Sequence, residues 1–123
     1  MSTGPSSDRT TAIREKLVGF PEGTTDAVLA FLATGADDAL DRAVAGILHF
    51  HTPPRPDGSK PDPAALTGTT RLREDLGLDS LAFAEMGFLV EDLLGTQLPE
   101  EDLLALQTVA DFRAHVRRAI HPS

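Results

Sequence analysis

Apolar residues recur at helical spacing in two short segments near the start of the chain. Residues 8–20 hold the first, which ends at Gly19-Phe20-Pro21. Thr24-Thr25-Asp26 provides side chains that can cap a second helix over 27–33, and Gly35 can stop it. The apolar residues of the first segment lie three or four positions apart: Ile13, Leu17 and Phe20. Residues 1–36 therefore predict an N-terminal extension, with a disordered polar tail followed by one or two short helices.

A third apolar stripe precedes a proline-rich segment. Asp37 or Asp38 can cap this helix, which fades around His51. The stripe consists of Leu40, Val44, Ile47 and Leu48. Residues 52–63 contain five prolines, which neither continue a helix nor fit a central strand. We therefore expect a long, mobile loop over 52–70.

The second half of the chain predicts one long helix and two shorter ones. Residues 80–94 are strongly apolar and suit a buried helix that ends at Gly95. Pro99 opens a short acidic segment, with proline in its first turn. Thr108 can cap a last helix. No stretch alternates as a strand would, so the predicted fold class is all-α.

Charge is distributed very unevenly. The chain has 19 acidic and 11 basic residues, for a formal net charge of −8. All of the Lys, Arg and His residues lie outside 74–112, a span with ten carboxylates. These are Glu74, Asp75, Asp79, Glu85, Glu91, Asp92, Glu100, Glu101, Asp102 and Asp111. Because a helix that only needs solubility usually mixes signs, this span indicates a surface for a cationic partner, although an ordinary acidic surface is the simpler alternative.

Composition excludes several classes of function. An acidic chain is a poor ligand for nucleic acid or an anionic membrane. The absence of Cys excludes disulfides, thiolate metal sites and a cysteine nucleophile. The first residues lack the regions of a signal peptide, and no apolar run approaches membrane-spanning length. We therefore expect a cytoplasmic protein.

The segment 74–81, Glu-Asp-Leu-Gly-Leu-Asp-Ser-Leu, resembles the modification site of acyl carrier proteins, Asp-Leu-Gly-x-Asp-Ser-Leu. The likeness continues through Glu85, Glu91-Asp92, 98–102 and Thr108-Val109. It implies a four-helix bundle of acyl-carrier type over 37–121. It also implies that a phosphopantetheinyl transferase attaches 4'-phosphopantetheine from coenzyme A to Ser80, with Asp79 and Leu81 beside it. The arm would hold acyl groups as thioesters, so the chain would be a carrier and not an enzyme.

Partner enzymes with basic surfaces would bind to the helix that follows Ser80. Glu85 and Asp92 are seven residues apart and share one helix face, and Glu91 is expected beside them. Phe88 is also predicted to contact partner enzymes. This face is expected to point away from the side of Leu81, Ala84 and Val90. The chain is expected to be a monomer.

The interior of the carrier domain raises two expectations. Gly87 lies in mid-helix, where glycine costs about 1 kcal/mol relative to Ala. Either a close helix crossing requires it, or Ala84, Gly87 and Val90 leave room for an acyl chain. The extension is expected to cover apolar surface of the Ser80 helix through Ile13, Leu17, Leu29, Phe31 and Leu32.

Other functions stay open at this point. An aminoacyl or peptidyl carrier would usually show Gly-Gly before its serine motif, whereas Gly77-Leu78 precedes Asp79-Ser80 here. An unmodified carrier fold could dock to a basic partner. A hydrolase is disfavoured, because a nucleophile elbow needs glycine two residues either side of its serine. His49 and His51 are two apart and have no evident third ligand, so no metal site is predicted.

Overall fold

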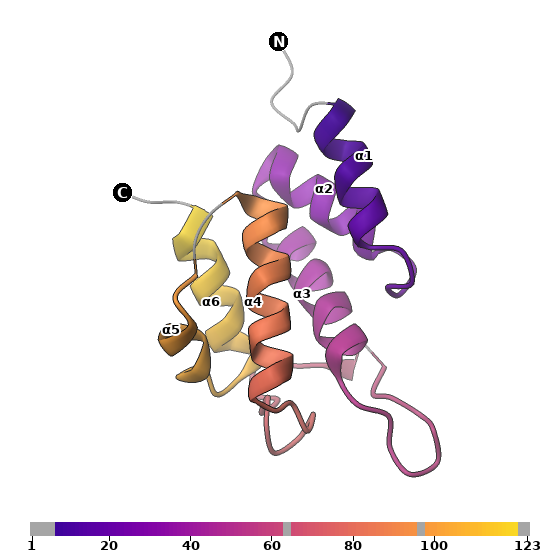
Figure 1. Cartoon of the computed structure of the whole chain (residues 1–123), viewed down its shortest axis with the longest axis vertical. Helices are drawn as coiled ribbons and strands as arrows, with labels where there is room; N and C mark the ends of the chain where they lie inside the picture. The colour runs from indigo at the N-terminus through magenta and orange to yellow at the C-terminus, as the bar shows by residue number, and fades with distance from the viewer. Residues whose placement is uncertain (1–6, 63–64, 96–97, 121–123) are drawn as a thin grey trace.

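The computed structural model describes residues 7–62, 65–95 and 98–120, which form six helices without a named strand (Figure 1). They are α1 (Ser7–Lys16), α2 (Thr24–Thr34), α3 (Asp37–His51), α4 (Ser80–Leu94), α5 (Glu100–Leu104) and α6 (Val109–Ile120). Arg71 and Thr108 form an isolated antiparallel bridge. The all-α prediction is confirmed. In the described ranges no helix is both long and apolar enough to cross a membrane. The predicted disordered tail falls mostly on residues 1–6, outside the described residues.

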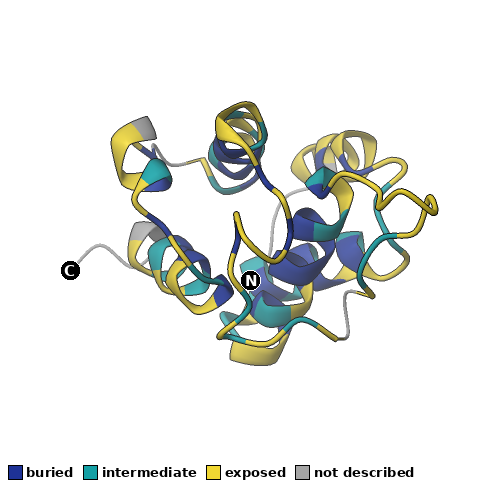
Figure 2. Ribbon diagram, turned by 90° about the horizontal axis from the view of Figure 1, so that it is seen from below, coloured by how far each residue is buried: buried dark blue, intermediate teal, exposed yellow. Residues whose placement is uncertain are grey.

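The core lies between α3, α4 and α6, with α2 packed against α3. Buried residues lie on the inner sides of the helices, whereas the outer sides are exposed (Figure 2). Its largest fully buried side chains come from the helices and from the segment before α4: Phe83, Phe112, Leu48, Leu72 and Met86. The predicted stripe of α3 is buried throughout, at Leu40, Val44, Ile47 and Leu48. Burial of such side chains is the main stabilising term of a bundle.

Helix α4 has the predicted bounds because both of its ends carry their own stop signals. The Asp79 carboxylate accepts a hydrogen bond from the Ala82 amide at 2.8 Å, which caps the first turn. Gly95 adopts φ 68°, a left-handed conformation that suits glycine, and its amide bonds to the Glu91 carbonyl oxygen. The helix therefore begins at Ser80 and ends at Leu94.

Other helix ends differ from the prediction. Helix α1 ends at Lys16, before the predicted stop at Gly19. Neither the Thr24-Thr25-Asp26 side chains nor the first two Asp residues of α3 act as caps. The N-cap of α2 is Gly23, at φ 88°, and that of α3 is Ala36. Pro99 is the N-cap of α5 and does not lie in its first turn.

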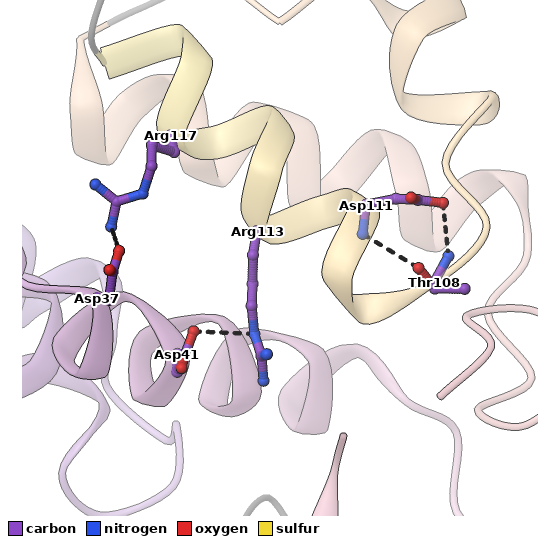
Figure 3. A network of polar contacts seen from close by, with 6 residues as sticks. All are labelled: Asp37, Asp41, Thr108, Asp111, Arg113 and Arg117. Carbon is purple, nitrogen blue, oxygen red and sulfur yellow. Dashed lines mark hydrogen bonds and ion pairs between the residues drawn. The ribbon is translucent and has the colours of Figure 1, made fainter. Parts of the chain in front are cut away.

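Thr24 and Asp37, which do not cap their helices, have partners that are distant in sequence. Thr24 is buried, and a Cβ added to Gly46 would collide with its side chain, so Thr24 is packed against α3. Asp37 forms an ion pair with Arg117 of α6 (Figure 3). A second pair joins Arg113 Nε to Asp41 Oδ1 at 3.1 Å, so α6 is tied to α3 at two points.

The N-terminal helices complete the core. Ile13 and Leu17 of the first segment and Phe31 of α2 are buried, whereas Leu29 and Leu32 are partly buried. Val28 and Phe31 share a small apolar cavity of about 20 Å³ with α4 residues that include Val90 and Leu93. Val28 and Phe31 of the extension therefore lie against part of α4, although Phe88 stays exposed.

The described part of the proline-rich loop is held by hydrogen bonds. Arg55 and Ser59 pair through the Arg55 amide and the Ser59 carbonyl at 2.7 Å, around Gly58 at φ 86°. Lys60 donates to the carbonyl oxygens of His49 and Phe50 at 3.3 and 3.2 Å. These carbonyls lie in the last turn of α3, where a cation is favourable. The loop thus folds back onto the end of α3.

Candidate functional site

Ser80 is the exposed first residue of α4, next to the exposed cap residue Asp79. The buried side chains of Leu76 and Leu78 hold the turn before Ser80 against the core. The Leu78 amide bonds to the Leu72 carbonyl at 3.1 Å, and Gly77 turns the chain at φ 73°. Buried leucines on each side of this glycine therefore hold Ser80 outward at the start of a helix.

One face of α4 is open to solvent and combines apolar and acidic side chains. Leu81 is 67% exposed and Phe88 is 68% exposed, while Glu85 and Asp92 are also exposed. Spacings of four, three and four residues put these four side chains on one face. The prediction that Leu81 lies away from the acidic face is therefore wrong, because Leu81 shares that face with Glu85 and Asp92. Val90 is buried on the core side.

The structure separates the predicted docking carboxylates. Glu91 is turned toward the loop after α4, where its Oε2 accepts a hydrogen bond from the Leu98 amide at 2.8 Å. Asp92 Oδ2 lies 3.3 Å from Lys16 Nζ of α1. Glu91 and Asp92 are adjacent in sequence, and the helix turns about 100° between them. Glu85 therefore shares its face with Asp92 but not with Glu91.

Ala84 and Gly87 face α5 and line a pocket of about 160 Å³ with Phe88, Glu91, Leu98 and Leu103. A Cβ added at Gly87 would collide with Leu103 Cδ1, so the close-crossing explanation of this glycine fits the structure. Val90 lines the separate cavity shared with α2. The three residues predicted to form one acyl-chain cavity are thus divided between two.

His49 and His51 lie in the last turn of α3. Within the described ranges no group of three or more His, Cys, Asp or Glu residues is placed to hold a metal ion. His51 Nδ1 lies 2.9 Å from the Ile47 carbonyl oxygen, inside its own helix. Burial lowers the pKa of His49, and the charge of Lys60 lowers it further.

Sequence reasoning missed three residues that shape this site: Arg9 and Lys16, which contact α4, and Leu103, which faces Gly87. A signal for the first two was present. Arg9 and Lys16 are seven residues apart, with Ile13 between them, so two cations flank the apolar stripe of α1. The crossing partner of Gly87 had no comparable local signal.

Comparison with known proteins identifies the domain around Ser80. Residues 60–116 match the family described as "Phosphopantetheine attachment site". This part of the chain is similar to the acyl carrier protein family. Members of this family are carriers that partner enzymes use, and their prosthetic group is a covalently attached 4'-phosphopantetheine.

Three of the relatives found are named as acyl carrier proteins. "Acyl carrier protein MbtL" of Mycobacterium sp. (strain MCS) is 45% identical over 58 residues, which are 47% of this chain and 65% of the relative. "Meromycolate extension acyl carrier protein" of Mycobacterium tuberculosis is 35% identical over 57 residues, 46% of this chain and 50% of the relative. "Acyl carrier protein" of Rhodococcus erythropolis matches at 35% over 57 residues, 46% of this chain and 63% of the relative. The chain thus spans between half and two thirds of the length of these relatives.

The residues around Ser80 fit a phosphodiester group. The first amides of a helix point along its axis and carry partial positive charge, and a phosphate at that end is stabilised by them. Ser80 is exposed at this end of the 15-residue α4, and the Asp79 carboxylate is bound to the Ala82 amide on the flank of the turn. When bound, 4'-phosphopantetheine supplies a thiol that this cysteine-free chain lacks.

Proposed function

We propose that this chain is an acyl carrier protein in which 4'-phosphopantetheine on Ser80 holds acyl intermediates as thioesters for fatty acid, polyketide or related biosynthesis. The observation that supports it most is the position of Ser80, exposed at the first residue of a capped helix inside the matched domain. A transferase needs a reachable hydroxyl, and the anchored turn before Ser80 presents it.

The partners proposed for this carrier are a phosphopantetheinyl transferase and acyl-processing enzymes with basic surfaces. Leu81 and Phe88 offer two exposed apolar contacts on α4, with Glu85 between them. Such a face favours a partner that carries apolar sockets beside a cation, since charge complementarity steers association while buried apolar contacts hold it.

The relatives' names support a lipid-like cargo. One is named for meromycolate extension, and we propose by analogy an acyl group, not an aminoacyl group. The pocket between α4 and α5 is the better candidate for the first part of such a chain, because the cavity beside Val90, at about 20 Å³, holds only about one water-sized group.

Attachment is tested by intact mass. The purified chain is incubated with coenzyme A, magnesium and a broad-specificity phosphopantetheinyl transferase, beside Ser80→Ala and a matched control, Ser59→Ala, which removes another exposed serine. We expect a gain of one phosphopantetheine in the parent chain and in Ser59→Ala, and no gain in Ser80→Ala. Modification that persists in Ser80→Ala would contradict the site. No modification of the folded parent, with a known carrier modified in parallel, would favour the unmodified docking protein.

The pocket is tested by hydrolysis of an acyl thioester on the loaded chain. Ala84→Val enlarges a side chain that lines the pocket and so reduces the pocket volume, whereas Ala82→Val makes the same change on the same helix outside the pocket. We expect faster thioester hydrolysis for Ala84→Val than for the parent and Ala82→Val, because less of the acyl chain would be sheltered. Equal rates for all three would remove the pocket from the proposal.

A further inference from the structure

Helix α1 contacts the C-terminal end of α4 at two points. Arg9 Nη2 donates a hydrogen bond to the Leu93 carbonyl oxygen at 2.5 Å, and Lys16 Nζ lies 3.3 Å from Asp92 Oδ2. Arg9 and Lys16 are two helical turns apart and so project from the same side of α1. Figure 1 shows α1 at the end of the molecule where α4 ends, while Ser80 begins α4 at the opposite end.

The position of α1 does not depend on these polar contacts alone. Ile13 is 2% exposed and Leu17 is 3% exposed, so both are buried in the core. The segment after α1 is fixed as well, since the rings of Phe20 and Phe50 stack with centroids 3.9 Å apart. An exposed ion pair by itself contributes little. The apolar anchors therefore keep the two cations of α1 next to α4.

The groups that α1 contacts are the ones that a basic partner would use. Asp92 shares the exposed face of α4 with Leu81, Glu85 and Phe88. The Leu93 carbonyl belongs to the last turn, where the helix end carries partial negative charge and attracts cations. A partner that extends along the whole face would meet Lys16 at Asp92 and the Arg9 guanidinium at the helix end.

We propose that α1 covers the C-terminal end of α4 and blocks partner enzymes from binding there. Partners would then dock on Leu81, Glu85 and Phe88 unless α1 is displaced. This inference rests on the proposed function, because it concerns which part of the acidic helix its partners can reach. It makes Lys16 a specificity-determining residue of the carrier. It also explains why Asp92, on the acidic face of α4, forms an ion pair with Lys16 of α1.

The experiment compares the affinity of the phosphopantetheinyl transferase for variants in the Ser80→Ala background, where binding proceeds without reaction. Lys16→Ala releases Asp92. Arg14→Ala is the matched control, because it removes one exposed cation from the same helix with the same change in net charge. We expect Lys16→Ala to tighten binding by up to about five-fold, the range of a surface ion pair, and Arg14→Ala to do so less.

A third variant isolates the contact. With Asp92→Asn present, Lys16→Ala and Arg14→Ala should change the affinity equally, because the carboxylate that Lys16 covers is gone. Equal effects of the two substitutions in the presence of Asp92 would overturn the proposal, since only net charge would then matter.

A second measurement does not involve a partner. In the folded parent chain, hydrogen exchange should show protected amides at the end of α1, and Arg9→Ala with Lys16→Ala should reduce that protection and speed exchange in the last turn of α4. If the α1 amides of the parent exchange as in an unfolded peptide, the proposal is overturned whatever the transferase does. Failure of the proposed function is distinguishable, because it would appear as a missing mass shift at Ser80 with α1 still protected.

Discussion

At the scale of single residues, Gly87 shows how one missing Cβ sets a helix crossing. Glycine is unfavourable inside a helix, yet the space beside Gly87 is filled by the buried Leu103 of α5. Close packing between α4 and α5 therefore offsets the free-energy cost of a glycine inside the helix.

Gly87→Ala is expected to lower the free energy of unfolding by about 1–3 kcal/mol, because overpacking outweighs the gain in helix propensity. Chemical denaturation measures it. The sign should reverse in a Leu103→Ala background, where Gly87→Ala should stabilise by up to about 1 kcal/mol. Destabilisation that persists without the Leu103 side chain would mean that some other contact requires the glycine.

His115 makes stability depend on pH. Burial lowers its pKa from 6.5, the charge of Arg118 lowers it further, and Asp102 acts in the opposite direction. Its Nε2 is buried without a hydrogen-bond partner among the described residues. As pH falls below 6.5, the unfolded chain takes up a proton that the folded chain does not. Stability should therefore decrease until the pH reaches the lowered pKa of the folded state.

Denaturation of His115→Gln at a series of pH values checks this, since Gln has no proton to gain. The variant should lose less stability than the parent between pH 7 and pH 5. An unchanged pH profile would assign the dependence to other groups, among them His49, whose pKa burial also lowers.

At the scale of elements, the last helix depends on a reciprocal cap. Thr108 Oγ1 accepts a hydrogen bond from the Asp111 amide at 3.2 Å, and Asp111 Oδ2 accepts one from the Thr108 amide at 3.2 Å (Figure 3). Asp111 Oδ2 also accepts a bond from the Gln107 amide at 3.1 Å. These bonds satisfy amides that would otherwise lack a partner at the start of α6.

Thr108→Ala should lower the free energy of unfolding by about 1 kcal/mol, the usual contribution of such a cap. Thr11→Ala is the comparison, because Thr11 is exposed inside α1 and Ala is the better helix former. We expect this control to be neutral or slightly stabilising in thermal denaturation. Equal losses in both variants would show that the cap at Thr108 contributes nothing of its own.

The elements also show what the sequence could and could not predict. Both stop signals of α4 are local, Asp79 at one end and Gly95 at the other, so its bounds and the exposure of Ser80 followed directly. Thr24 and Asp37 have equally good capping chemistry, but both side chains interact with residues that are distant in sequence. Thr24 packs against Gly46, and Asp37 forms an ion pair with Arg117. The division of Ala84, Gly87 and Val90 between two cavities has the same origin, because only the packed helices decide which side faces α5.

At the scale of the whole molecule, the N-terminal helices are part of the core and not an appendage. Phe31 of α2 is 4% exposed, and the Arg117 guanidinium carbon lies 5.6 Å from the centre of its ring. Phe31 also lies against the cavity bordered by α3, α4 and α6. Folding of the carrier domain and docking of these helices should therefore be cooperative.

Removal of residues 1–36 is expected to lower the melting temperature and solubility, because it uncovers apolar side chains of α3 such as Leu40 and Val44. Phe31→Ala tests the same point with a single change and should cost about 3–5 kcal/mol. Val18→Ala is its control, since Val18 is 77% exposed. An unchanged melting temperature after the deletion would show that the domain over 37–121 is stable by itself.

The placement of α1 and Ser80 at opposite ends of α4 has a practical consequence for attaching the chain to a surface. A helix of 15 residues is about 22 Å long, so a sensor chip that captures the chain through an exposed residue of α1, such as Asp8, would hold it at the end remote from the serine. Ser80 would then face the flowing solution, and enzymes could be passed over it one after another.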